Sequence, residues 1–196
     1  MPSADSTPIP EVAELNALSA DAFVAALAPL FEGATRFLRR VAEERPFESD
    51  AELLAAAHEV AISMPEDERV ELVEAHPRIG ADVDTVSDLS RDEQGYDEES
   101  DEDAETARAY EELAMLNEIY ERQFGFRYVV FVAGRSKAEI VPLLEHALRN
   151  DREAELRRAL DETLDIAADR LARLREEAAG PEVSDPAVSV PDEAGP

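Results

Sequence analysis

Apolar residues recur every three or four positions along almost the whole chain, and this spacing constrains the fold more than any other feature. Such spacing is typical of helices that bury one face. The last helix is expected over residues 151–178, where Leu156, Leu160, Ala167 and Leu171 share one side. The pattern predicts an all-α protein, folded as a single-domain helical bundle.

Residues 128–132 interrupt this helical pattern. The run is short, apolar and rich in β-branched residues, as strands are, but the chain offers no second strand to pair with it. We therefore expect one buried extended segment. Its backbone amides must find hydrogen-bond partners outside a sheet.

Several helix ends carry local signals. Ser49 and Ser136 each stand three residues before a glutamate, which is the spacing of a capping box at a helix start. Another helix is expected to end at His76, because Pro77 disfavours helical backbone in the residue before it.

The two ends of the chain differ in composition from its middle. Residues 1–11 and 179–196 combine Pro, Ser, Gly and acidic residues with little apolar content, so we expect disordered tails there. Residues 12–178 are long enough for one domain with a single core. Within them, residues 81–103 form an acidic connection that is long for a structureless loop, and such loops are often functional.

The chain is strongly acidic. It has 47 Asp and Glu against 19 Lys and Arg, a net charge of −28, and Lys137 is its only lysine. Such a surface repels phosphates, so we expect no nucleic-acid partner. Two interpretations of the charge remain, a salt-adapted (halophilic) protein and a binder of a basic partner. The acidic residues are spread along the chain, not gathered in one tail, which favours salt adaptation.

Other features narrow the class of protein. Cysteine is absent, which excludes disulfides, thiolate nucleophiles and cysteine-based metal sites. No apolar run is long enough to cross a bilayer and the N-terminus does not resemble a signal peptide, so we expect a cytoplasmic protein without membrane contact. There is no glycine-rich phosphate loop and no His or Glu pair with zinc-site spacing, and we predict no bound metal.

Two basic side chains stand where chemistry is plausible. His76 ends a helix, where a protonated imidazole is favoured and suits a proton donor; alternatively, it caps the last carbonyls. Arg170 borders the apolar stripe of the last helix and requires a carboxylate or carbonyl partner, which is either a ligand or an internal glutamate. His58 and His146 are interpreted as structural or surface residues, and Arg173 and Arg175 as solvent-exposed charges.

Ordered motifs along the chain carry more information than any single residue. They are Phe31-Glu32, Arg45-Pro46-Phe47, His76-Pro77-Arg78-Ile79-Gly80, Ser90-Arg91-Asp92-Glu93-Gln94, Leu116-Asn117 with Tyr120 and Phe124-Gly125-Phe126, and Ile166-Ala167-Ala168-Asp169-Arg170-Leu171. In this order they resemble the family of 2-oxo-4-hydroxy-4-carboxy-5-ureidoimidazoline (OHCU) decarboxylases. The resemblance implies an all-α enzyme of urate catabolism that converts OHCU to (S)-allantoin and CO₂ without a cofactor, and it suggests a homodimer.

The resemblance also implies roles for particular residues. His76 and Glu93 match catalytic positions, with His76 handling a proton. The implied substrate contacts are Pro77, Ser90, Glu93, Gln94, Phe126, Tyr128, Val129, Val130, Phe131, Val132 and Arg170. Arg127 departs from the family pattern, which often has proline there, and the connection between Gly80 and Ser90 is short and acidic.

Two other functions are compatible with the same residues. A non-catalytic all-α binding module would leave His76, Glu93 and Arg170 apart in space, whereas the enzyme requires them around one pocket. A related enzyme acting on another small carboxylated heterocycle would keep the pocket and change only the substrate.

Overall fold

The computed structural model describes residues 8–81, 86–94 and 104–179. Its helices are α1 (Val12–Ala17), α2 (Ala20–Leu27), η1 (Ala28–Phe31, a 3-10 helix), α3 (Thr35–Glu43), α4 (Asp50–Ser63), α5 (Glu66–Ala75), α6 (Asp88–Glu93), α7 (Ala104–Phe124), α8 (Lys137–Ala147) and α9 (Arg152–Ala179). The described residues contain no strand. The predicted all-α class is therefore confirmed.

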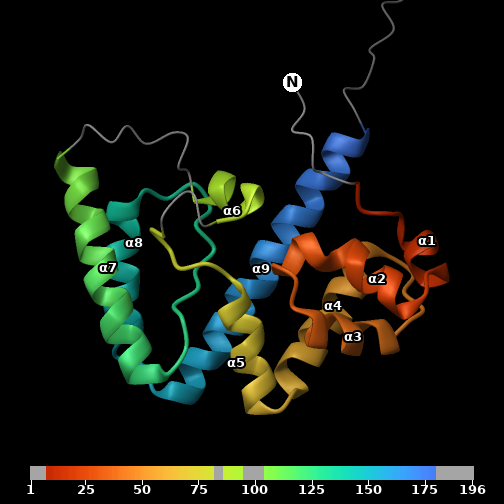
Figure 1. Cartoon of the computed structure of the whole chain (residues 1–196), viewed down its shortest axis with the longest axis horizontal. Coiled ribbons are helices and arrows are strands. Elements are labelled where there is room, and N and C mark those ends of the chain that lie inside the picture. The colour runs from red at the N-terminus through yellow and green to blue at the C-terminus, as the bar shows by residue number, and fades with distance from the viewer. Residues whose placement is uncertain (1–7, 82–85, 95–103, 180–196) are drawn as a thin grey trace, which may run out of the picture.

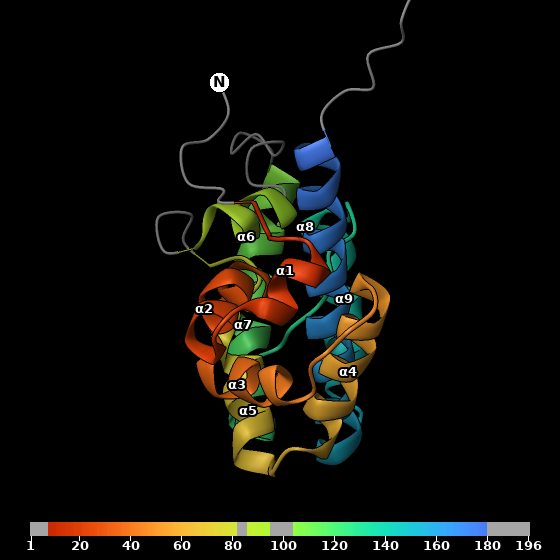
Figure 2. The same cartoon turned by 90° about the vertical axis from the view of Figure 1, so that its right-hand side faces the viewer.

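Helix α9 organises the bundle. It is the longest of the described helices, with 28 residues, and runs between the α1–α4 group and the α7–α8 pair (Figure 1). Figure 2 shows the α1–α4 group facing the viewer with α7 behind it. Helices α4, α5 and η1 pack directly on α9, while α7 packs on α8. None of the described helices is long and apolar enough to cross a membrane.

The predicted capping signals are present at the starts of helices α4 and α8. At α8, the Ser136 hydroxyl accepts from the Glu139 amide and the Glu139 carboxylate accepts from the Ser136 amide, so the capping box is complete. At α4, Ser49 accepts from the Glu52 amide. These caps satisfy amides that the first helical turn leaves without partners.

The folded domain begins earlier than residue 12. Ile9 is buried, and the Arg175 guanidinium on α9 donates to the carbonyls of Ile9 and Pro10, at 2.5 and 2.9 Å. The same guanidinium pairs with Asp50 through two bonds of 3.0 Å. Arg175 is therefore a structural clamp and not a solvent-exposed charge. The rest of the expected tails, residues 1–7 and 180–196, lies outside the described residues.

The acidic connection contains a short helix. Residues 88–93 form α6, and this part of the connection carries the Ser90 and Glu93 motif. Ser90 lies inside α6 and does not begin it, so the spacing of Ser90 and Glu93 does not mark a capping box here. Residues 82–85 and 95–103 of the connection lie outside the described part of the chain.

The predicted extended segment joins α7 to α8. Residues 127–132 have no regular secondary structure, and four of residues 128–132 are buried. Helix α7 ends at Phe124 and is followed by Gly125, whose positive φ of 77° is a backbone conformation that glycine adopts without strain.

Candidate functional site

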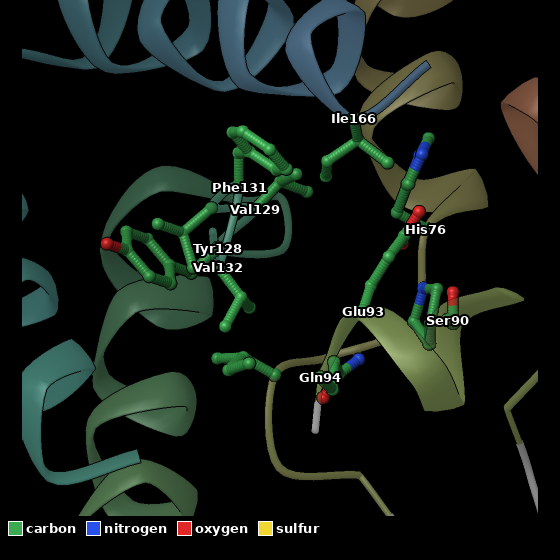
Figure 3. Close-up of a pocket in the computed structure, with 12 residues that line it drawn as sticks. His76, Ser90, Glu93, Gln94, Tyr128, Val129, Phe131, Val132 and Ile166 are labelled. Atoms are coloured by element: carbon green, nitrogen blue, oxygen red, sulfur yellow. The ribbon is translucent and has the colours of Figure 1, made fainter. Parts of the chain in front are cut away.

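One narrow cavity lies where the end of α5, helix α6, the extended segment and α9 meet (Figure 3). The empty space in it, including open solvent at its mouth, is about 380 Å³. The lining residues are His76, Pro77, Ile79, Ser90, Glu93, Gln94, Tyr128, Val129, Val130, Phe131, Val132 and Ile166. All the residues implied by the resemblance line this cavity except Phe126 and Arg170.

His76 is the titratable side chain whose state matters most here. It is 3% exposed, and neither of its ring nitrogens has a hydrogen-bond partner among the described residues. Burial, reinforced by the Arg170 charge and opposed by Glu32 and the Leu72 backbone, lowers its pKa from 6.5 to about 4. The imidazole is therefore neutral near pH 7. The sequence suggested that the helix C-terminus favours a protonated His76. In the structure the ring is neutral, because desolvation outweighs the effect of the helix C-terminus.

The backbone of His76, and not its ring, ends helix α5. Its amide donates to the Val73 carbonyl at 3.3 Å. Arg127 adds a cationic cap, donating from Nη1 to the carbonyls of Glu74 at 3.0 Å and His76 at 3.1 Å. The residue that departs from the family pattern thus ties the start of the extended segment to the end of α5.

Arg170 lies behind the cavity wall, fully buried on α9. Its Nε and Nη2 bind the two Glu93 carboxylate oxygens at 2.6 and 2.8 Å, a bidentate pair. Its Nη2 also contacts Glu32 at 2.7 Å, and Nη1 donates to the Pro29 carbonyl at 2.9 Å. The partner left open by the sequence is therefore an internal carboxylate. Arg173 also reaches Glu93, at 3.0 Å, so it too is more than a solvent-exposed charge.

Ser90 links the two acidic partners of Arg170. Its hydroxyl donates to Glu32 Oε1 at 2.7 Å and accepts from Arg170 Nη2 at 3.0 Å. Burial raises the pKa of Glu93, with Arg170 and Arg173 opposing the rise. For Glu32, burial alone would raise the pKa, but Arg170 and the hydroxyls of Ser90 and Ser87 outweigh it and lower the pKa. The site thus holds one buried arginine between two carboxylates.

Glu32 belongs to the first motif, but the sequence indicates no role for it. It directly follows η1 and adopts the left-handed conformation, with φ 48° and ψ 34°. This conformation is strained for a residue with a side chain and costs on the order of 1 kcal/mol or more. Only the tertiary structure shows that this turn directs Glu32 toward Arg170.

Gln94 lines the cavity, and Lys137 binds its backbone. The Gln94 side chain accepts from the Gly80 amide at 3.0 Å and donates to the Arg78 carbonyl at 3.4 Å. Lys137, the only lysine, is 1% exposed, and its ammonium donates to the Gln94 carbonyl and lies 5.6 Å from the Tyr110 ring centre. Helix α6 is thereby tied to the loop after His76 and to the start of α8.

Two aromatic residues of the extended region play different structural parts. Phe126 does not line the cavity, because its ring packs edge-on against Tyr120 with centroids 5.8 Å apart. Tyr128 lines it, and burial raises the pKa of its phenol to about 12, so the group is neutral. Ile79 and Ile166 complete the apolar lining. Both belong to motifs already recognised in the sequence, which is the signal that identifies them.

Across the described residues, no three His, Asp or Glu side chains are grouped so that they could hold a metal ion. The arrangement instead offers a neutral imidazole, a carboxylate fixed by arginine, and backbone amides of the extended segment. Together these groups can bind a small polar molecule and move a proton.

The chain was compared with known proteins. The sequence model of the OHCU decarboxylase family matches residues 16–172. The chain is 31% identical over 159 residues to the 2-oxo-4-hydroxy-4-carboxy-5-ureidoimidazoline decarboxylase of Haloferax volcanii, covering 81% of this chain and 92% of that protein. It is 30% identical over 161 residues to the uric acid degradation bifunctional protein of a Bacillus species, covering 82% of this chain and 31% of that protein. The chain thus spans about a third of such bifunctional relatives.

Solved structures agree with the sequence comparison. A crystal structure of OHCU decarboxylase in the presence of (S)-allantoin matches with a TM-score of 0.59 and 25% identity, over 75% of this chain and 94% of that one. A crystal structure of (S)-allantoin synthase matches with a TM-score of 0.62 and 20% identity, over 84% of this chain and 54% of that one, and supports the fold alone. With the family match over most of its length and the motif residues around one cavity, the chain belongs to the OHCU decarboxylase family.

Proposed function

We propose that this protein decarboxylates OHCU to (S)-allantoin and CO₂ in urate degradation, without a cofactor. The observation that carries the proposal is the neutral, unpartnered imidazole of His76 in a cavity that also holds Glu93. A buried imidazole without an internal partner is available to a ligand. The names of the matched relatives supply the substrate and the product.

The reaction requires the protein mainly to orient the substrate and to transfer protons. In OHCU one ring carbon carries both the hydroxyl and the carboxylate, and its neighbour carries the ureido group. As CO₂ leaves, the carbon–carbon bond breaks and its electron pair moves onto a ring nitrogen, which takes a proton from solvent. The hydroxyl then becomes a carbonyl by losing its proton, and the ureido-bearing carbon gains a proton on one face. These changes give allantoin.

The cavity residues suit these steps. His76, neutral at the start, accepts the hydroxyl proton and delivers a proton to the ureido-bearing carbon. Glu93, held by Arg170, orients the substrate by accepting from its hydroxyl or ureido groups. Amides of residues 128–132 stabilise the negative charge that develops on the ring. Pro77 and Gln94 shape the same pocket, while Ser90 and Arg170 act through Glu93.

Freshly generated OHCU is the direct test of this function. We expect the protein to release CO₂ faster than the spontaneous reaction and to yield (S)-allantoin alone, because the proton is delivered within a chiral cavity. Gas release and circular dichroism of the product measure both. An unchanged rate with racemic product would contradict the proposal. Turnover of a different carboxylated heterocycle in preference to OHCU would favour the related-enzyme alternative.

The binding-module alternative is the weaker one on geometry. It expects His76, Glu93 and Arg170 to lie apart, whereas His76 and Glu93 line one cavity and Arg170 binds Glu93 directly.

We place the activity in the cytoplasm, and we propose a homodimer on the family resemblance. Light scattering of the purified protein tests the dimer.

We also propose that the acidic surface is an adaptation to salt. With 47 acidic against 19 basic residues, repulsion between like charges outweighs the attraction of surface ion pairs, and salt screens the net repulsion. We expect the melting temperature to rise by about 5 °C or more from dilute buffer to molar KCl. Thermal melts across a KCl series measure this. A melting temperature that is flat or falls over the series would contradict salt adaptation.

A further inference from the structure

Helix α9 holds the extended segment from one side through two charged residues. Arg158 Nη1 donates to the Val129 carbonyl at 2.9 Å. Glu162 Oε2 accepts from the Phe131 amide at 2.6 Å, a short charge-assisted bond. Arg158 and Glu162 are one helical turn apart and contact each other at 3.5 Å. These two side chains take the place of a neighbouring strand, which the described residues lack.

Arg158 is itself firmly fixed. Its Nε donates to Glu155, fully buried, at 2.6 Å, and its guanidinium lies 4.8 Å from the centre of the Tyr128 ring. Glu155 also accepts from the Tyr120 hydroxyl at 2.7 Å and from Asn150 at 2.8 Å. Because these hydrogen bonds and ion pairs hold Arg158 in place, the edge that contains Val129 and Phe131 has little freedom to move.

The opposite edge of the segment is the one that matters for the site. In a trans peptide group, the carbonyl of one residue and the amide of the next point in opposite directions. The Val129 carbonyl faces Arg158 on α9, so the Val130 amide, which belongs to the same peptide group, faces away from the helix. No described group accepts a hydrogen bond from this amide, and Val130 lines the cavity.

We infer that Glu162, supported by Arg158, is a positioning residue for the reaction. By holding the Phe131 amide, it fixes the position from which Val130 presents its amide to the charge that develops on the ring. The inference rests on the proposed function, which supplies that charge. Glu162 does not line the cavity, so it acts through the backbone and not by touching the substrate.

Three variants of the full chain test this role. Glu162→Ala removes the acceptor, Glu162→Gln keeps a carboxamide oxygen that still accepts from the Phe131 amide, and Asp165→Ala removes an exposed carboxylate from the same helix. We expect Glu162→Ala to lower kcat about 10- to 100-fold with a smaller change in KM, since displaced oxyanion donors mainly cost transition-state binding. The enantiomeric excess of the allantoin should fall as well.

The other variants define the outcome. Glu162→Gln should keep kcat within about fivefold of wild type, and Asp165→Ala should match wild type. Wild-type kcat and a single enantiomer from Glu162→Ala would overturn the inference and leave the proposed function intact. An equal loss in Glu162→Gln and Glu162→Ala, with product still one enantiomer, would also overturn it, because the hydrogen bond to Phe131 would not be what matters. A wild-type protein without OHCU turnover would overturn both proposals.

Discussion

Replacement of His76 by asparagine is expected to lower kcat by about 10²–10⁴-fold, the usual contribution of a positioned acid or base. The fold should persist, because the His76 ring makes no hydrogen bond to any described group and the helix end is capped by backbone and by Arg127. The residual product should approach the racemic mixture that spontaneous decay gives. Stopped assays with chiral analysis of allantoin measure rate and stereochemistry together.

His58 provides a matched control for this variant. It is a half-exposed histidine that pairs with Asp161 at 3.0 Å and is not part of the cavity lining. His58→Asn should therefore keep wild-type kcat and (S)-allantoin. If the His76→Asn protein also kept both, His76 would not handle the proton.

The pH profile tests the state of the same imidazole. Burial lowers the pKa of His76 to about 4, and the proposed mechanism starts from the neutral ring. The kcat/KM of the wild type should therefore show no loss from histidine protonation near 6.5, the ordinary value, and should drop at lower pH as Glu93, whose pKa burial raises, and then His76, near 4, take up protons. An acidic limb centred near the ordinary value would contradict a buried, neutral His76.

Local patterns in the sequence predicted most of the fold. The capping box of Ser136 and Glu139 and the helix end at His76 depend on neighbours within a few residues, and the structure contains both. The unpaired run at 128–132 was also predicted as extended. Its partners were not, because Arg158 and Glu162 lie about thirty residues further along the chain.

The protonation state of His76 and the ion pairs of Arg170 were not predicted, for a related reason. The helix C-terminus seen in the sequence favours a charged His76, but the burial that reverses this arises from elements remote in sequence. Likewise, Arg170 pairs with Glu32, which is far away in the sequence. The left-handed turn that brings Glu32 to it cannot be predicted from the spacing of residues. The same holds for Lys137, which composition marks only as the single lysine and the structure places beneath α6.

Arg170→Met is expected to be the most destabilising single change at the site. The variant leaves Glu93 and Glu32 buried without the guanidinium that binds both, and breaking a buried pair in this way costs about 3–5 kcal/mol. Arg170→Lys should cost less, because it keeps the charge and loses the planar fork. Urea denaturation of each variant near pH 7 measures these losses. Arg122→Met is the control, since that surface pair with Glu118 contributes about 1 kcal/mol or less.

The pH dependence identifies the cause of the loss. Without Arg170, both carboxyls should have raised pKa values in the folded state, so they bind protons there before they do so in the unfolded chain. The deficit of Arg170→Met against wild type should therefore shrink as the pH falls from 7 toward about 5. A deficit that does not change with pH, or that equals the deficit of Arg122→Met, would contradict a buried ionic clamp.

Measuring the decarboxylation rate of a triple variant distinguishes a role of these residues in catalysis from a role in stability alone. Adding Glu32→Gln and Glu93→Gln to Arg170→Met removes the unpaired charges, so most of the stability should return. Decarboxylation should not return, because Glu93 would no longer present a fixed carboxylate to the cavity beside His76. Recovery of both stability and kcat in this triple variant would show that the three residues serve only the fold. Recovery of stability alone is the expected result, and it would place the ionised Glu93, held by Arg170, in the catalytic apparatus.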